Sequence, residues 1–431
     1  MLSYYLKIIL EATRPFFNVK YNPFLSSSQF VKFDMNEYNS LDLNNLVSKF
    51  EDMFINLIGN QNILSFSSAR MGFFHLLKVL DIKKGDEIII CSGTCSVMIN
   101  SIIRSGAKPI YSDIDSYTLG SSEIEISKKI SNKTRMIIAQ HNFGIPCQIE
   151  EIQRLCNMHE IFLLEDCALT LQSKVNRISV GSFGDAAIYS LDHTKPLNCF
   201  TGGVLSIKDN FLFSRAKRLY LDVGNISRIK QSKMIKRFIR EDMLFKSKKL
   251  NRLKIFDLIL TIKRKLGYIS PFLDENSDLK TNQISYPYPA KLPPFSAYIG
   301  IMQLDNWEKT VLLRKQNFNL LIKELNKSTL KSSIPKVYFD KKFNIIPLRF
   351  VIWNENSKIL KDKLGQFIDI EGIWFQKPII SSKLSSNFFG YKNDCPVSEK
   401  IGHNIINIPL DISQNQLKIL IENILIKTNL K

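Results

Sequence analysis

The chain has 431 residues, of which 45% are hydrophobic, and it carries a formal net charge of +19. This length and composition predict at least two globular domains with a large core and exclude a low-complexity or disordered chain. No apolar run reaches 18 residues, which argues against a membrane-spanning helix, whereas the charge is compatible with nucleic acid, an acidic membrane face or small anionic substrates as partners.

The cysteines are odd in number, scattered and without a CxxC pair, and they are Cys91, Cys95, Cys147, Cys156, Cys167, Cys199 and Cys395. We therefore expect reduced thiols, as in a cytosolic protein, and neither a disulfide framework nor a zinc site. The histidines do not cluster with them, so no metal is expected. The N-terminal stretch has charges at Lys7, Glu11 and Arg14 and no small-residue cleavage site, which predicts an amphipathic helix rather than a signal peptide.

Residues 1–45 show no strong period and are expected to form an arm packed on a neighbouring surface. Helical spacing of apolar residues predicts a helix over 46–58. A second helical run, over 71–80, follows the small residues Ser67, Ser68 and Ala69. Such a turn can be an anion site, because free N–H groups and the helix dipole meet there, or simply a serine N-cap.

Short apolar runs then alternate with helical patterns as far as residue 207. Strands are predicted over 86–90, 108–112, 135–139, 161–164, 186–189 and 204–207, with a turn over 91–95. Helices are predicted over 97–103 and 149–158. This alternation is typical of right-handed βαβ units, so we expect an α/β fold built on a mostly parallel sheet.

Two of these strands end in chemically useful side chains. Glu165 and Asp166 follow one strand, and Ser190 and Lys195 lie at or just after the end of another. Ligands of open α/β sheets bind beyond the carboxyl ends of strands, so Asp166 and Lys195 could face one pocket. Pyridoxal phosphate requires such a pair, a lysine for its aldehyde and an acid for its pyridine nitrogen. The alternative is that Asp166 caps the next helix and Lys195 is a solvated loop residue.

The character of the sequence changes after residue 210. Between residues 211 and 270 there are 17 lysines and arginines against four carboxylates, with apolar residues at helical spacing. This stretch predicts helices packed on the body with a solvated basic face, or a surface that contacts anionic lipid. Prolines between 287 and 294 then mark a linker. A long helix over 297–325, strands near 345–352 and a helix over 414–426 predict a smaller α+β domain.

The ordered motifs of the chain resemble the nucleotide-sugar aminotransferases of the DegT/DnrJ group, which are fold-type I pyridoxal-phosphate enzymes. The resemblance runs from about residue 46 to 425, with the basic stretch as its main interruption. Its pieces in chain order are SSARMGF, GDEIIICSGTC, GAKPIYSDID, KTRMIIAQHNFGIP, LLEDCAL, VGSFGDAAIYS, HTKP, TGG, AYIGIMQL with Arg314, and IINIPL at 405–410. After the arm expected at 1–45, it implies a large cofactor-binding domain at 46–285 with a basic helical insertion at about 211–270, and a small α+β domain at 286–431.

The resemblance also assigns roles to individual residues. Lys195 matches the Schiff-base lysine and Asp166 the acid on the pyridine nitrogen. Ser190 matches a phosphate-binding serine, and Ser68, Ala69 and Arg70 lie where the phosphate is held. Cys95 lies where a residue covers the cofactor ring, and His193 is expected to be structural or a minor substrate contact.

Three positions depart from the family pattern. Many relatives carry an aromatic residue where this chain has Cys95. A glutamine that holds the phenolic oxygen of the cofactor is replaced by Leu169, although Gln172 is nearby. The asparagine that a neighbouring subunit commonly contributes aligns with Pro289.

The resemblance implies a cytoplasmic homodimer that binds pyridoxal 5'-phosphate and has its sites at the subunit interface. It would transfer an amino group from an amino acid, glutamate by analogy, to a keto sugar that is nucleotide-linked, in surface-polysaccharide or glycan synthesis. Nucleic acid is not expected as a partner. The competing hypothesis is a catalytically degenerate binding protein that attaches to an anionic surface, such as the inner face of a membrane, through its basic insertion.

Overall fold

The computed structural model describes residues 33–192, 194–246, 259, 262, 286–354, 357–364, 374–380 and 386–426. His193 and the first 32 residues of the predicted arm lie outside them. The remainder of that arm contains the short helix α2 (Met35–Ser40), in which Tyr38 is buried.

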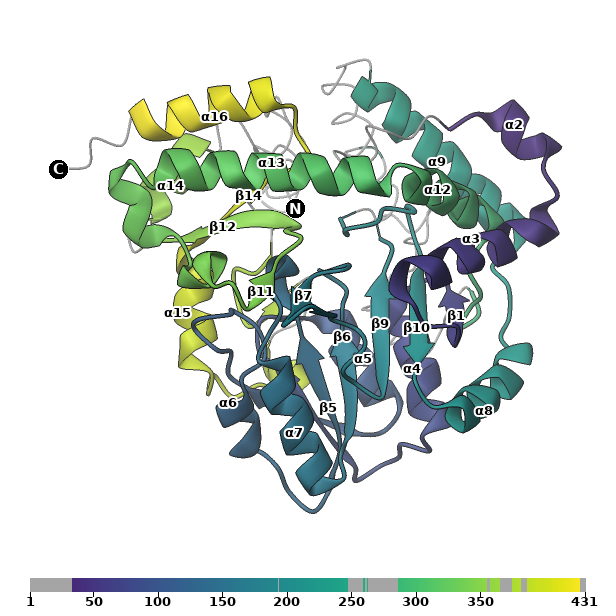
Figure 1. Cartoon of the computed structure of the whole chain (residues 1–431). Helices are drawn as coiled ribbons and strands as arrows, with labels where there is room; N and C mark the ends of the chain where they lie inside the picture. The colour runs from purple at the N-terminus through teal and green to yellow at the C-terminus, as the bar shows by residue number, and fades with distance from the viewer. Residues whose placement is uncertain are drawn as a thin grey trace.

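A seven-stranded sheet forms the centre of the molecule, with the strand order β1-β10-β9-β6-β5-β2-β4 (Figure 1). Its strands are β1 (Ile63–Phe66), β2 (Glu87–Cys91), β4 (Lys108–Ser112), β5 (Thr134–Gln140), β6 (Phe162–Asp166), β9 (Ala186–Ser190) and β10 (Gly203–Ile207). The five strands from β9 to β4 are mutually parallel, and β10 runs antiparallel to both β9 and β1. The expected mostly parallel sheet is therefore confirmed.

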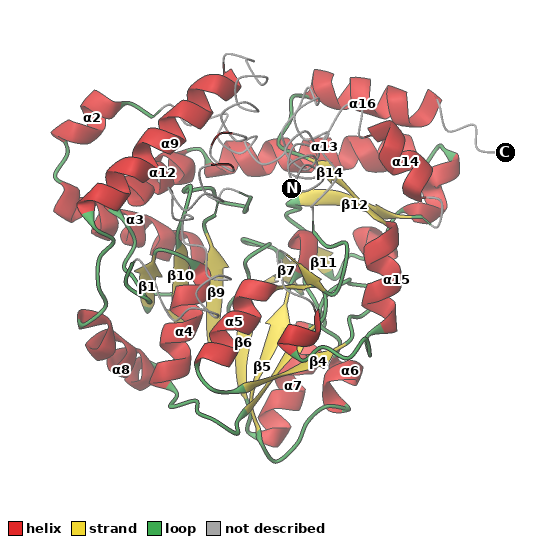
Figure 2. Cartoon of the chain, turned by 180° about the vertical axis from the view of Figure 1, so that it is seen from behind, coloured by secondary structure: helices red, strands yellow, loops and turns green. Residues whose placement is uncertain are grey.

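Helices cover both faces of this sheet, which explains why its strands are continuous apolar runs rather than alternating ones. One face carries α4 (Ala69–Val79) and α5 (Ser96–Arg104), and the other carries α3 (Leu43–Ile58) and α7 (Ile149–His159) (Figure 2). Ile88, Ile89 and Ile90 in β2 are fully buried as a result. The short helix α6 (Glu123–Ser127) and the two-residue strands β7 (Lys174–Val175) and β8 (Ile178–Ser179) lie in the connections.

The C-terminal part has its own hydrophobic core around a two-stranded antiparallel sheet, β12 (Arg349–Trp353) with β14 (Ile405–Pro409). Its helices are α13 (Trp307–Leu325), α14 (Ser357–Leu364), α15 (Pro396–Asn404) and α16 (Gln414–Ile426). Smaller elements are η4 (Thr329–Ser333), η5 (Lys336–Phe339), β11 (Phe343–Asn344), β13 (Ile379–Ile380) and η6 (Ser386–Phe389). Helix α12 (Pro294–Asp305), which precedes α13, packs instead on α3. It belongs to the first core, the hydrophobic core around the seven-stranded sheet. The domain boundary after residue 285 stays a prediction.

The single long helix predicted over 297–325 is wrong, because the chain breaks between α12 and α13. Asn306 leaves the helical conformation, with φ −109° and ψ 11°. Its side-chain amide donates to the carbonyl of Met302, and its side-chain oxygen accepts from the Lys309 amine. Asparagine favours such local bonds over helix continuation, so the break follows from residue chemistry that hydrophobic spacing does not reveal.

The strand predicted near 345–352 begins later than expected. Before β12 the backbone instead contacts the connections that follow β5 and β6, where the N–H of Ile346 donates to Ser173 Oγ and that of Leu348 to the Phe143 carbonyl. Several strands were not predicted. They are β1, β3 (Thr94–Cys95), which lies inside the predicted turn, and β7, β8, β11, β13 and β14.

The basic stretch begins with two helices, α8 (Asn210–Leu221) and α9 (Arg228–Lys246). Met234, Ile235 and Phe238 of α9 are buried in the first core, in agreement with the predicted helical packing. Apart from positions 259 and 262, residues 247–285 lie outside the described part of the chain. Within that part, each helix is too short or too polar to traverse a bilayer.

Candidate active site

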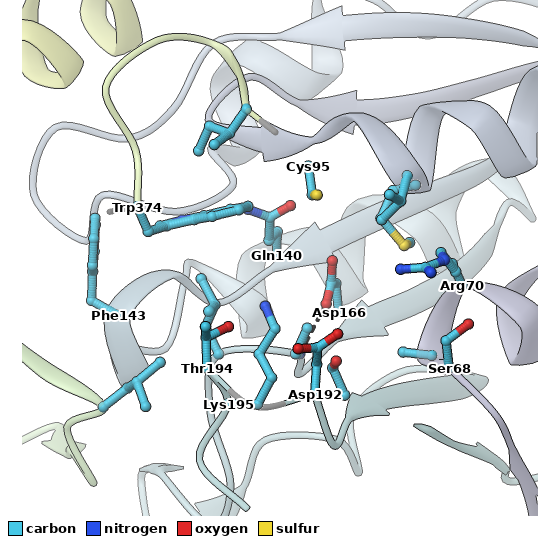
Figure 3. Close-up of a pocket in the computed structure, with 18 of the residues that line it drawn as sticks. Ser68, Arg70, Cys95, Gln140, Phe143, Asp166, Asp192, Thr194, Lys195 and Trp374 are labelled. Atoms are coloured by element: carbon cyan, nitrogen blue, oxygen red, sulfur yellow. Dashed lines mark hydrogen bonds between the residues drawn. The ribbon is translucent and has the colours of Figure 1, made fainter. Parts of the chain in front are cut away.

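A cavity of about 350 Å³ opens at the carboxyl ends of β6 and β9 (Figure 3). It lies on the side of the sheet where open α/β folds bind their ligands. All of the site residues predicted from the sequence line this single cavity, namely Ser68, Ala69, Arg70, Cys95, Asp166, Ser190 and Lys195. The fold therefore brings together segments that are far apart in the chain.

Asp166 is the last residue of β6 and is only 4% exposed. Its Oδ1 accepts the backbone N–H of Ala168 at 2.9 Å. Burial raises the pKa of this carboxyl, and the Ala168 hydrogen bond together with the charge of Lys195 acts in the opposite direction. A further positive charge would stabilise the ionised form of this buried carboxyl, and a protonated pyridine nitrogen would supply that charge.

Lys195 lies in the loop after β9, where its N–H donates to the Asp192 carbonyl at 3.0 Å. Its amine points into the cavity and lies 5.6 Å from the ring centroid of Trp374. The next residue, Pro196, is hydrogen-bonded to helix α13, because its carbonyl accepts from Nη2 of Arg314 at 3.0 Å.

Arg314 belongs to α13 and is fully buried. Its Nε and Nη2 donate to the two carboxylate oxygens of Asp411, which follows β14. A bidentate pair of this kind fixes orientation as well as charge. The arginine thus connects the lysine loop with two elements of the C-terminal part.

A cradle for an anion forms at the N-terminus of α4. Ser68 is 6% exposed, and its Oγ has no hydrogen-bond partner among the described residues. The backbone before it is held by Thr201, whose Oγ1 donates to the Ser67 carbonyl at 2.7 Å. At Gly203 a Cβ would lie 2.1 Å from the amide nitrogen of Ala69, so only glycine allows this approach. A phosphate would find the positive end of the helix dipole and an unsatisfied hydroxyl here.

Behind Asp166 lies a buried network around Glu165. The Glu165 carboxylate accepts N–H groups from Gly181, Phe183 and Gly184, and it also bonds His141 Nε2 at 3.1 Å. Nδ1 of His141 accepts the N–H of Cys147, which leaves the ring proton on Nε2. Cys167 approaches the same cluster. Both oxygens of Glu165 are already used, so this network supports the strand end rather than offering metal ligands.

The residues that depart from the family pattern differ in whether they line the cavity. Leu169 and Cys95 both line the cavity. Gln172 does not line it, because its amide is engaged by Trp307 Nε1 at 2.7 Å and by the Leu57 carbonyl at 3.1 Å. Gln172 therefore does not take over the role of the family's glutamine, whose position is occupied by Leu169 in this chain. Pro289 also lies outside the lining of the cavity.

Sequence reasoning did not identify Gln140 and Trp374, which line the same cavity. Gln140 ends β5, and its Nε2 donates to the Gly93 carbonyl and to Asn142 Oδ1, whereas its Oε1 is buried without a partner in the described part of the chain. Its place after a strand was a usable signal. Trp374 comes from the C-terminal part, and no local pattern marks it as a pocket residue.

Comparison with known proteins yields a consistent set of relatives. The sequence model of the DegT/DnrJ/EryC1/StrS aminotransferase family matches residues 34–239 and 272–423. The GDP-perosamine synthase of Escherichia coli O157:H7 is 34% identical over 171 residues, which cover 40% of this chain and 47% of that protein. The dTDP-4-dehydro-2,3,6-trideoxy-D-glucose 4-aminotransferase of Saccharopolyspora spinosa is 30% identical over 172 residues, covering 39% of this chain and 45% of that protein.

These alignments span about half the length of each curated relative. Among solved structures, a putative sugar aminotransferase from Streptococcus pneumoniae in its PLP form superposes with a TM-score of 0.66. It is 16% identical and covers 88% of this chain and 90% of its own. The likeness confirms the predicted fold class, an α/β fold of type I.

Proposed function

The chain belongs to the DegT/DnrJ/EryC1/StrS aminotransferase family, and we propose that it transfers an amino group to a keto sugar, nucleotide-linked as in its named relatives. The observation that carries this proposal is the meeting of Lys195, Asp166 and the Ser68 cradle in one cavity. An amine, an acid and an anion site in one place are the three protein groups that pyridoxal phosphate chemistry requires.

The cofactor of this family is pyridoxal 5'-phosphate, and the residues of the cavity fit it. When bound, it supplies an electron sink that stabilises negative charge on a substrate carbon. Ser68, Ala69, Arg70 and Ser190 would hold its phosphate. Asp166 would keep its ring nitrogen protonated, because the carboxylate favours the cationic form.

Lys195 would bind the cofactor in the resting enzyme and act as general acid and base during turnover. Its free Nζ would act as general base toward the α-carbon proton of the amino donor, and as general acid it would give the proton back. With the keto sugar, Lys195 would move a proton in the reverse direction. Glutamate as the donor and surface-polysaccharide synthesis as the setting are supported by family resemblance.

The second candidate is a degenerate binding protein of the same fold. Leu169 and Cys95 favour it, because neither reproduces the contact that the family makes at its position. The buried Asp166 and the unsatisfied Ser68 hydroxyl oppose it, since such groups lower stability unless a ligand uses them. A yellow purified protein with a visible absorption band from bound cofactor is expected of the enzyme.

The direct assay supplies glutamate and a panel of nucleotide-linked keto sugars and looks for amino-sugar products by mass spectrometry. We expect product from at least one sugar, and its loss in Lys195→Ala. Omission of glutamate, or its replacement by other amino acids, identifies the donor. Absence of amination across the panel, in protein that remains colourless with added pyridoxal phosphate, would support the binding protein instead.

We further propose a cytoplasmic homodimer with its sites at the subunit interface. Family resemblance supports the dimer, and the thiols support a reducing compartment, because all seven cysteines lie in the described part and none is paired. Light scattering of the purified protein measures the dimer directly. A monomer that still turns over would contradict the shared site.

A further inference from the structure

The segment from Trp374 to Ile380 forms one wall of the cavity. Its strand β13 pairs in parallel with β3, so that Ile380 lies opposite Cys95. Just before this pairing, the carbonyl of Pro378 accepts the N–H groups of Gly93 at 2.7 Å and Thr94 at 3.0 Å. The turn that carries Cys95 is therefore attached by its backbone to the C-terminal part.

The two segments are also complementary in shape. Gly93 has φ +76°, and a Cβ there would lie 3.0 Å from the ring of Phe375. Phe375 is fully buried and stacks on Phe143 at 5.9 Å between centroids. The small residues of the turn thus leave room that aromatic side chains of the C-terminal segment occupy.

Trp374 is held in a fixed orientation beside the reactive amine. Its Nε1 donates to Asn142 Oδ1 at 2.8 Å, and the same oxygen accepts Nε2 of Gln140. The ring centroid lies 5.6 Å from Lys195 Nζ. Figure 3 shows the Lys195 amine pointing into the space bordered by Trp374, Gln140 and Asp166.

We infer that Trp374 supplies the aromatic face of the cofactor pocket that Cys95 does not provide, an inference that rests on the proposed function. Among the described residues that line the cavity, the aromatic ones are Phe143 and Trp374, and Phe143 is already stacked on Phe375. A protonated pyridine ring is electron-poor, and indole is the side chain that best attracts a cation to its face.

The test compares variants that change aromaticity at position 374 and keep an apolar side chain there. Pyridoxal phosphate is titrated into cofactor-free protein, and its dissociation constant is read from the visible absorption band rather than from activity. Trp374→Leu should weaken binding about tenfold, the scale of one lost aromatic contact. Trp374→Phe should stay within about threefold of the parent, since it retains a ring. Trp353→Leu, a tryptophan of β12 that does not line the cavity, is the matched control and should bind normally.

A rescue experiment completes the test. Cys95→Phe, added to Trp374→Leu, should restore most of the lost affinity because it returns a ring to the position that relatives use. Equal dissociation constants for the Leu and Phe variants, or no gain from Cys95→Phe, would overturn the inference and leave the proposed function intact. A parent protein that does not bind pyridoxal phosphate would overturn both.

Discussion

Asp166 illustrates at the scale of one residue how a functional group is kept at a cost in stability. Its carboxyl is buried, and burial raises its pKa. In the cofactor-free protein the ionised form therefore lowers stability, and this cost is absent below the pKa of the unfolded chain and complete above the raised pKa of the folded one. A bound cation would reverse the balance.

We therefore expect Asp166→Asn to melt at the same or a higher temperature than the parent when both lack cofactor at neutral pH. The difference should shrink as the pH falls through the raised pKa, because the parent becomes neutral there as well. The same variant should lose most of its turnover, since an amide cannot hold the pyridine nitrogen protonated. Each unit by which the pKa of that nitrogen falls removes about 1.4 kcal/mol of stabilisation from its protonated form. Thermal melts across pH and an amination assay measure the two effects. Near-normal turnover would show that Asp166 is not the partner of the ring.

Leu169 offers a second test at the same scale. Its side chain lines the cavity and is 5% exposed. Leu169→Gln should leave the fold intact and tighten pyridoxal phosphate binding about two- to tenfold, the value of one hydrogen bond. Leu169→Met is the matched control, because it changes shape without adding a donor. A weaker complex with glutamine than with methionine would mean that the side chain belongs to the apolar packing.

At the scale of elements, the lysine loop is fastened to the C-terminal part by the pair of Arg314 and Asp411. Both side chains are buried, at 0% and 9% exposure. Removing one partner of a buried pair leaves an uncompensated charge, and this costs more than removing both.

Arg314→Met and Asp411→Leu should each lower the free energy of unfolding by roughly 3–5 kcal/mol. The double variant should be more stable than the sum of the two losses predicts, which urea unfolding of all four proteins measures. Simple additivity of the two losses would show that the pair is not coupled.

The elements also show what a sequence can and cannot predict. Strand ends that carry Asp166 and Lys195 are local features, and the helix from Gln414 to Ile426 has the predicted bounds. The break at Asn306 depends on side-chain bonds, and the position of Trp374 depends on the pairing of β13 with β3. The pairing of β13 with β3 joins residues that are distant in sequence. At Asn306, the side-chain bonds outweigh the apolar spacing that predicted one continuous helix.

At the scale of the whole molecule, the family match confirms the resemblance seen in the ordered motifs. Part of the excess positive charge lies on α8 and α9. Large apolar side chains stand exposed on α8 and α9, with Phe211 78%, Leu221 72% and Ile229 74% exposed. Exposed basic residues lie between them, among them Arg215, Lys217, Arg218 and Arg228. Apolar anchors among cations suit an anionic lipid surface.

We expect co-sedimentation with anionic vesicles at low salt, weakened at high salt and absent with neutral lipid. Each basic residue near such a surface contributes about 1 kcal/mol, screened within about 10 Å at 0.1 M salt. Arg215→Glu combined with Arg218→Glu should abolish binding. Lys358→Glu with Lys400→Glu, on α14 and α15 at the opposite end of the molecule from α8, is the matched control (Figure 1). Negligible sedimentation in every condition would leave only the packed helices with a solvated face.

We propose Lys195 as the amine that carries the cofactor. The most direct measurement is borohydride reduction of the protein loaded with pyridoxal phosphate, followed by protease digestion and mass mapping of the labelled peptide. We predict that the label lies on Lys195 and that it disappears in Lys195→Ala. A label on another lysine, or a loaded protein that cannot be labelled, would show that Lys195 does not carry the cofactor.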